Sequence, residues 1–476
     1  MTDYLIRALL TFKDDLNRAQ HMPSPEGYLS ALAWAEFDSS LVGGDPSAWL
    51  AYQRKEQSAI SRPNARFTVP ASSDLQGALY QNGLAESGRG YSSAAAAILN
   101  SILGLKVEKA KTQPVSPLTP SLALLQNSRG LMQTGNPPNF AAIFEKLYIL
   151  GRPADTETGN GVSHLWRIAS ERRLESDSLL RLIDKAFQHE GVTIVGSRID
   201  ARNKPNYEDA APIQRPPVFQ NSPFSWFHQS WTRLTSDAWV DALPAKVWVD
   251  WAMCVLRGTV GFSFVWEASW YNKLADAIID PKSTDITSLL NSPLEIMPWA
   301  SNEETPEMRN VASLMKWRVA NGQKLRREIN LFFEEHDLLE RGVEDALLLA
   351  ASDRELGGKL TQLRQQRTGD EGPWEAVTSA LTARSASVGS TDHYGFWRKH
   401  GNQMTFVAPT TEWMAVLASL SSSQPHSTIS LGELMNNLRT LGLRPAVKEV
   451  VALLENAGLA RGSDDADLGL KIETAY

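Results

Sequence analysis

The chain of 476 residues holds few side chains whose type and spacing could support catalysis. The run Glu334-Glu335-His336-Asp337 has the residue types of a metal site. In a helix, however, adjacent residues point to different faces, and no second histidine follows four residues later, so a solvated helix end is predicted here. His393 and His400 flank Phe396-Trp397-Arg398-Lys399 and would share a face only if this segment is helical. The alternative for this segment is a surface piece that docks the tail.

Nucleophilic and phosphate-binding signatures are equally scarce. Cys254 is the single cysteine, which excludes an intramolecular disulfide and a cysteine zinc cage, and its apolar neighbours predict a buried, inert thiol. No Walker spacing of glycines followed by Lys and Ser or Thr occurs, and Thr158-Gly159-Asn160-Gly161 lacks the third glycine of a dinucleotide-binding loop. We therefore expect neither a metal nor a cofactor. An enzyme whose carboxylates come from distant positions stays an alternative, because such a site leaves no local signature.

One dense basic run stands out in the second half of the chain. It consists of Lys316, Arg318, Lys324, Arg326 and Arg327. A run of this kind, followed by acids, is usual on a solvated helix face, but it is also the densest cationic cluster available to a nucleic acid. The net charge of −7 gives the whole chain no attraction for phosphate. Any nucleic-acid contact therefore has to come from a local basic surface or from partner subunits.

The composition predicts a globular protein of more than one domain. Hydrophobic residues make up 42% and charged residues 21%, and the length exceeds the roughly 250 to 300 residues at which a single core usually stops growing. Helical spacing dominates, so we expect a mainly α, multi-domain fold that begins with an amphipathic helix in residues 1–15. No stretch approaches roughly 18 uninterrupted apolar residues, and the start is unlike a secretory signal. This pattern predicts a cytoplasmic protein without membrane contact.

Proline-rich loops suggest where the domains meet. We predict an N-terminal helical domain in residues 1–199, a proline-rich linker or long loop in 200–223 and a tryptophan-rich central helical domain in 224–390. Seven tryptophans crowd into the first part of the central domain: Trp226, Trp231, Trp239, Trp248, Trp251, Trp266 and Trp270. Pairs such as Trp266 and Trp270 share one helical face, so we expect the rings to anchor a core rather than to stack on bases.

The last part of the chain has the most regular pattern. Thr410 is placed to cap a first helix with an apolar face, and Ile429 predicts a short strand. Ser430 and Glu433 then form a capping-box pattern that begins a second helix, which Gly442 is predicted to end.

A third helix is predicted from Arg444-Pro445 up to Gly458, because proline is suited to the first helical turn. Leu459-Ala460 and residues 468–473 then predict two strands, joined by the polar hairpin 461–467. The short connection between the second and third helices is typical of a helix-turn-helix.

This order of elements over residues 405–476 resembles the winged-helix superfamily and implies a C-terminal α+β module. In its DNA-reading members the third helix enters the major groove, whereas other members dock proteins. Five cations could hold a DNA backbone: Arg439, Arg444, Lys448, Arg461 and Lys471. Acids in the third helix and in the hairpin oppose direct insertion. DNA contact and protein docking therefore both stay open.

Together these observations predict a non-catalytic component of a prokaryotic multi-protein DNA-handling or anti-phage defence assembly. In this hypothesis the helical body binds partner proteins, while the winged helix contacts DNA or another subunit. The predicted nucleic-acid-binding residues are the five cations of the module together with Lys324, Arg326 and Arg327. A stand-alone protein-interaction scaffold and an enzyme with a dispersed carboxylate site are the alternatives.

Overall fold

The computed structural model describes residues 4–12, 16, 22, 24–36, 102–105, 114–124, 140–153, 161–187, 214–299, 305, 309–384, 391–401, 404–460 and 470–476. These residues are mainly helical, as predicted, and also form two small two-stranded sheets. The elements are η1 (Ile6–Ala8), α1 (Pro25–Glu36), α4 (Pro120–Leu124), α5 (Phe140–Leu150), α6 (Val162–Ser176), α7 (Ser178–Phe187), α8 (Pro217–Gln220), α9 (Pro223–Leu234), α10 (Asp237–Ala242), α11 (Ala245–Ile279), α12 (Ile286–Asn291), α14 (Val311–Glu335), α15 (Val343–Ser352), α16 (Arg354–Gln365), α17 (Gly372–Leu381), β1 (Trp397–His400), β2 (Met404–Val407), α18 (Thr411–Ser419), β3 (Thr428–Ser430), α19 (Leu431–Thr440), α20 (Val447–Asn456) and β4 (Lys471–Glu473).

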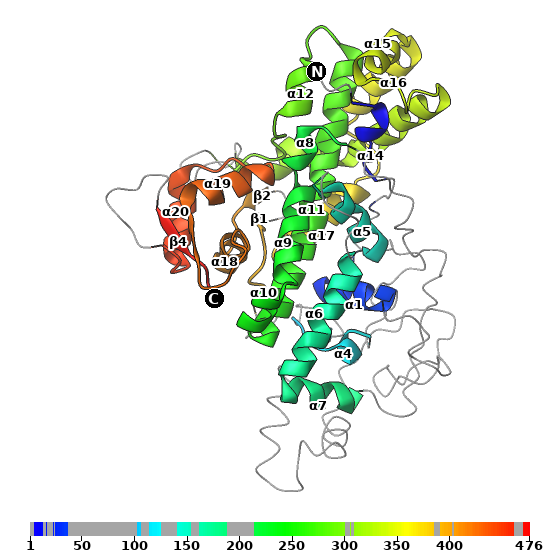
Figure 1. Cartoon of the computed structure of the whole chain (residues 1–476). Helices are drawn as coiled ribbons and strands as arrows, with labels where there is room; N and C mark the ends of the chain where they lie inside the picture. The colour runs from blue at the N-terminus through cyan, green and yellow to red at the C-terminus, as the bar shows by residue number, and fades with distance from the viewer. Residues whose placement is uncertain are drawn as a thin grey trace, which may run out of the picture.

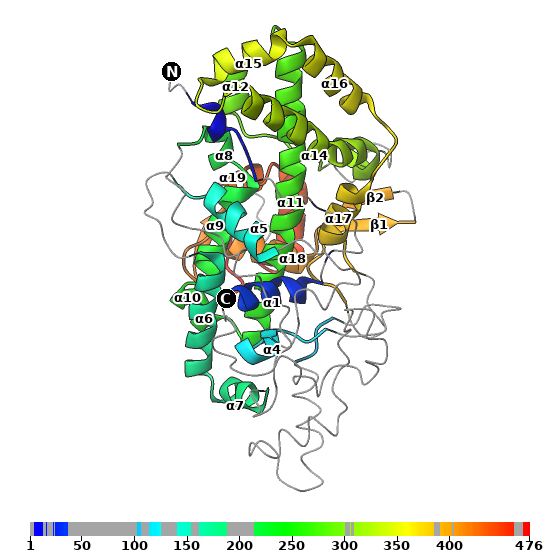
Figure 2. The ribbon, with the colours of Figure 1, turned by 90° about the vertical axis from the view of Figure 1, so that its right-hand side faces the viewer.

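The 35-residue helix α11 forms the axis of the molecule (Figures 1 and 2). At 1.5 Å per residue it is roughly 52 Å long. Helices α9, α14 and α17 pack along it, while α1 and α18 contact it from opposite sides. The N-terminal helices and the C-terminal elements are therefore held by one common helix.

Every residue of α11 from 251 to 271 is buried, so this part of the helix is covered on all sides and is mostly apolar. Small residues allow its neighbours to come close. A Cβ atom at Gly261 would lie 2.3 Å from Leu381 of α17, and one at Gly322 of α14 would lie 2.5 Å from Ala268 of α11. A side chain at Gly322 would therefore push against the α11 backbone at Ala268, whereas one at Gly261 would require the Leu381 side chain to move.

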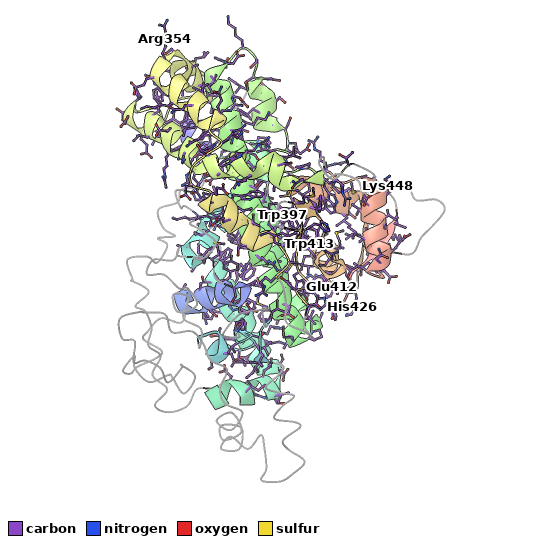
Figure 3. The ribbon with its side chains drawn as sticks, turned by 180° about the vertical axis from the view of Figure 1, so that it is seen from behind. Arg354, Trp397, Glu412, Trp413, His426 and Lys448 are labelled. Carbon is purple, nitrogen blue, oxygen red and sulfur yellow. The ribbon has the colours of Figure 1, made fainter. Side chains whose placement is uncertain are left out.

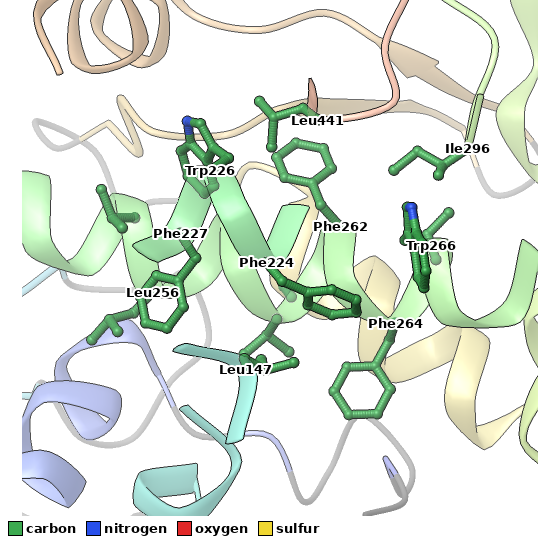
Figure 4. Packing of buried hydrophobic residues seen from close by; sticks show 14 of the residues in the cluster. Leu147, Phe224, Trp226, Phe227, Leu256, Phe262, Phe264, Trp266, Ile296 and Leu441 are labelled. Carbon is green, nitrogen blue, oxygen red and sulfur yellow. The ribbon is translucent and has the colours of Figure 1, made fainter. Parts of the chain in front are cut away.

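The tryptophans form the centre of the core, which confirms the prediction from their spacing. All seven side chains are at most 7% exposed. Trp266 stacks on Trp270 with ring centroids 5.5 Å apart and meets the edge of Phe224 at 5.0 Å. Figure 4 shows Trp266 and Phe224 in this core together with Leu147 of α5 and with Leu441, directly after α19. One continuous core thus joins the N-terminal helices to the C-terminal elements.

The predicted amphipathic helix in residues 1–15 is wrong for the part that the structure describes. Residues 4–12 contain only the single 3-10 turn η1, and the amide groups of Ile6 and Arg7 donate to carbonyl oxygens of the loop before α15. The side chains of Arg215 and Trp270 donate to further carbonyl oxygens of this segment. Tertiary hydrogen bonds therefore replace the helical ones.

The segment between His393 and His400 is extended rather than helical, so the two histidines do not share a helical face. Strand β1 pairs with β2 in an antiparallel hairpin, with Trp397 opposite Val407. Phe396 and Trp397 are buried. The boundaries proposed for the domains stay predictions, because residues 200–213 and 385–390 lie outside the described part of the chain.

Candidate nucleic-acid interface

The C-terminal unit comprises α18, β3, α19, α20 and β4, and its first two helices begin as the sequence predicts. The Thr410 hydroxyl caps α18 by accepting the amide N–H of Trp413. Ser430 and Glu433 form the complete capping box of α19. Gly442 follows α19 with a φ of 78°, in the left-handed region that favours glycine. Local hydrogen bonds therefore fix the start of two helices and the turn that follows.

Strands β3 and β4 form the small two-stranded sheet of this unit. They pair antiparallel, and Ile429 faces Ile472. The amide of Thr474 donates to Ser427 beside β3, while that of Glu473 donates to Leu459, 3.0 Å away. Neighbouring amides of a strand point to opposite edges, so Leu459 lies across β4 from β3. The prediction of a strand at Leu459-Ala460 is wrong, because these two residues form no regular strand. Among the described residues, a single hydrogen bond joins them to β4.

The inner side of the C-terminal unit is fixed to the body. Trp413 packs against Phe262 of α11 and against Phe396, with ring centroids 6.2 and 4.7 Å apart. The amide of Ile296 donates to the carbonyl oxygen of Gly442, 3.0 Å away. A Cβ at Gly442 would lie 2.7 Å from the carbonyl oxygen of Leu294, which leaves no room there. The turn between α19 and α20 is therefore held directly by the body.

Helix α20 lies on the outer side of the unit, away from α11 (Figures 1 and 3). It begins at Val447, three residues later than the predicted start at Arg444. Val450 and Leu454 face inward, whereas Lys448 is exposed. Ala446 supplies no side-chain acceptor at the N-terminus of α20.

Four predicted cations are exposed on this unit. Arg439, Arg444 and Lys448 follow one another from the end of α19 through the turn into α20, whereas Lys471 lies on β4. Arg439 donates to Asn436, and the Arg444 Nε lies 3.7 Å from a carboxylate oxygen of Glu295. Three of the predicted cations thus lie in the last turn of α19, in the connecting turn and in the first turn of α20.

The remaining predicted cations do not extend this group. Arg326 is 2% exposed, and its Nη1 lies 3.1 Å from a carboxylate oxygen of Glu267, so its assignment to a nucleic-acid surface is wrong. The neighbouring Arg327 is exposed and Lys324 is half-buried, but both lie on α14 in the body. Arg461 lies outside the described residues.

A cleft of about 980 Å³ lies beside the turn. Arg444 lines it together with residues from the end of α11, from α12, from α14 and from the end of α16. Its cations are Lys273, Arg318, Arg364 and Arg444, and its carboxylates are Asp276, Asp280, Asp285 and Glu295. The two signs balance, so the cleft as a whole has no preference for anions.

A smaller pocket of about 200 Å³ adjoins this cleft and contains charge of one sign only. We call it the arginine pocket; its lining consists of Asn272, Ser313, Leu314, Trp317, Arg318, Arg364 and Arg367. The sequence pattern singled out Arg318 but missed Arg364 and Arg367. These two follow α14 by a whole helix and a loop, and no local spacing connects them with Arg318.

The buried carboxylates have structural partners. Those of the described residues are Glu26, Glu145, Asp184, Glu267 and Asp392. Each accepts hydrogen bonds from a helix N-terminus, a loop amide or an arginine. Burial alone would raise the pKa of Asp392, but the adjacent guanidinium groups of Arg257 and Arg384 outweigh burial and hold this pKa below its usual range. None of the five lines the cleft.

The cysteine and the histidine that the sequence suggested as reactive groups also have structural surroundings. Cys254 is buried, as predicted, and burial raises the pKa of its thiol, which disfavours the nucleophilic thiolate. His336 ends α14 and stacks on Phe332. No group of three or more histidine, cysteine or acidic side chains suited to a metal ion occurs within the described ranges.

A comparison with known protein families and with curated protein sequences finds no match for this chain. Among the helices that the structure describes, none has the length and apolarity needed to cross a membrane.

Proposed function

We propose that this chain is a non-catalytic component of a prokaryotic multi-protein DNA-handling or anti-phage defence assembly, with a C-terminal winged-helix module that contacts DNA. One observation carries the proposal: α20 follows α19 across a short turn, packs against α18 with its buried face and presents its outer face to solvent. This is the placement that a recognition helix needs.

The charges at the turn support contact with phosphate. Arg444 and Lys448 lie just before and in the first turn of α20, at the positive end of its dipole, where Ala446 makes no side-chain cap hydrogen bond; Arg439 lies in the last turn of α19, before the turn. Helix N-termini with adjacent cations bind anions well. Because the turn is bonded to Ile296, a phosphate bound there would also be fixed relative to the body.

Duplex binding by the full chain tests the proposal. Fluorescence anisotropy should show binding at about 50 mM salt that weakens steeply as salt rises, and Lys448→Glu or Arg444→Glu should remove most of it. Arg354→Glu is the matched control, because Arg354 is exposed at the far end of the body from α20 (Figure 3). If no duplex binds at low salt, the DNA version fails.

Protein docking is the second candidate, and the apolar part of the outer face favours it. Val447 is 38% exposed, and Val451 lies one turn further along α20. Glu455 is exposed on the same helix and would repel phosphate. In this case Val447→Asp should disrupt binding to a partner subunit with a shallow salt dependence, and Lys448→Glu should change little. Neighbouring genes for a helicase, nuclease or methyltransferase would supply the partners to test.

A further inference from the structure

We propose that the arginine pocket is a second site, which binds the phosphate groups of a single nucleic-acid strand. The pocket lies on the body, between α14 and the end of α16, and not on the C-terminal unit. Strand binding at the arginine pocket does not require that α20 binds DNA, so each of the two proposals can fail without the other.

The first argument is uncompensated positive charge. Arg318 makes no hydrogen bond or ion pair with any described residue, and Arg367 donates only to the carbonyl oxygens of Arg364 and Gln366. Arg364 forms an ion pair with Asp276, with its Nη1 2.6 Å from a carboxylate oxygen. Three arginines thus line one small pocket, and Asp276 supplies the one carboxylate that pairs with them among the described residues. Their forked donors match the geometry of phosphate oxygens.

The position of Arg318 excludes the simplest structural explanation. Arg364 and Arg367 stand at the end of α16, where the helix dipole favours cations whatever the function. Arg318 is the eighth residue of the 25-residue helix α14, far from its C-terminus, so the dipole does not favour a cation there. Lys324, one of the cations predicted from sequence, lies on the same helix with its ammonium group close to Gly369, beyond the end of α16. The positive surface therefore continues past the pocket.

The uncharged lining points to a nucleotide unit. Trp317 is half-buried and adds an aromatic ring to the lining; the Lys316 ammonium lies 5.0 Å from its ring centroid and 2.8 Å from a carboxylate oxygen of Glu371. Asn272 and Ser313 add neutral polar groups. Aromatic walls beside cations bind unstacked bases of a single strand, whereas a duplex keeps its bases stacked inside. The structure thus favours a single strand over a duplex at this pocket.

The test measures binding of a short labelled single-stranded oligonucleotide to the full chain across a salt titration. Arg318→Gln should lower the affinity about five-fold at 0.1 M salt and reduce the salt slope by about 0.7, and Arg318→Gln with Arg367→Gln should roughly double both effects. Arg354→Gln, at the opposite end of α16, is the control and should change neither. Unchanged melting temperatures show that the variants fold.

Competition and one further variant distinguish the remaining outcomes. The same oligonucleotide unlabelled should displace the probe, whereas pyrophosphate, a mononucleotide and polyglutamate should compete weakly. A mononucleotide that binds as tightly as the strand, or polyglutamate that binds when the strand does not, would overturn the proposal. Lys448→Glu should weaken duplex binding but leave strand binding intact. If Arg318→Gln leaves strand binding unchanged, the arginine pocket is not the site, even where Lys448→Glu abolishes duplex binding.

Discussion

Arg326→Met should destabilise the protein by about 3 to 5 kcal/mol, because it removes one partner of a buried ion pair. The Arg326 Nη1 lies 3.1 and 3.2 Å from the two carboxylate oxygens of Glu267, and both side chains are 2% exposed. It also donates to the carbonyl oxygen of Phe12, which ties the N-terminal segment to α14. The substitution would leave a buried carboxylate without its cation, and this accounts for most of the expected loss.

Urea unfolding followed by tryptophan fluorescence measures this loss as a lower midpoint. Arg327→Met is the matched control, because the neighbouring arginine is exposed and should cost less than about 1 kcal/mol. Arg326→Met combined with Glu267→Gln should recover much of the stability, since no buried charge is then left alone. Equal midpoints for Arg326→Met and Arg327→Met would refute the burial of this pair.

Three further predictions concern the core, the pH dependence and the turn. Trp266→Ala should cost about 3 to 5 kcal/mol in urea unfolding; a variant as stable as the parent would place the ring outside the core. Burial, together with the charge of Arg152, lowers the pKa of His228 to about 4. The unfolded chain therefore takes up a proton first, so stability should fall as the pH drops from about 6.5 toward 4, by at most about 2 kcal/mol at pH 5 and less with solvent screening. His228→Gln should flatten this part of the pH profile of stability, and an unchanged profile would contradict the assignment. Gly442→Ala should lower the melting temperature and weaken binding through α20, because a Cβ would meet the carbonyl oxygen of Leu294; wild-type behaviour would show that the turn can move away from the body.

Features specified by neighbouring residues could be predicted from the sequence. Two helix starts are specified by hydrogen bonds between residues three positions apart: one from Trp413 to Thr410, the other between Ser430 and Glu433. The turn at Gly442 is specified by its positive φ, which favours glycine. The tryptophan core could be predicted because such large apolar rings require burial.

Features that depend on distant residues could not be predicted in this way. The basic run has the pattern of one solvated helix face. Arg326 nevertheless points inward, because it pairs with Glu267 of α11, 59 positions earlier in the sequence. The arginine pocket combines α14 with the end of α16, and no sequence period connects these elements. Residues 4–12 have helical spacing, but their carbonyl oxygens accept hydrogen bonds from side chains more than two hundred positions away in the sequence. In each case tertiary contacts override the local pattern.

Photo-cross-linking from the outer face of α20 tests the proposed DNA contact most directly. Ala452 is exposed there, and a photoreactive amino acid at this position should cross-link to duplex DNA at low salt and lose the cross-link as salt rises. The same group at Leu348, 54% exposed on α15, should give no cross-link. Cross-linking at Leu348 without cross-linking at Ala452 would contradict the proposed use of α20.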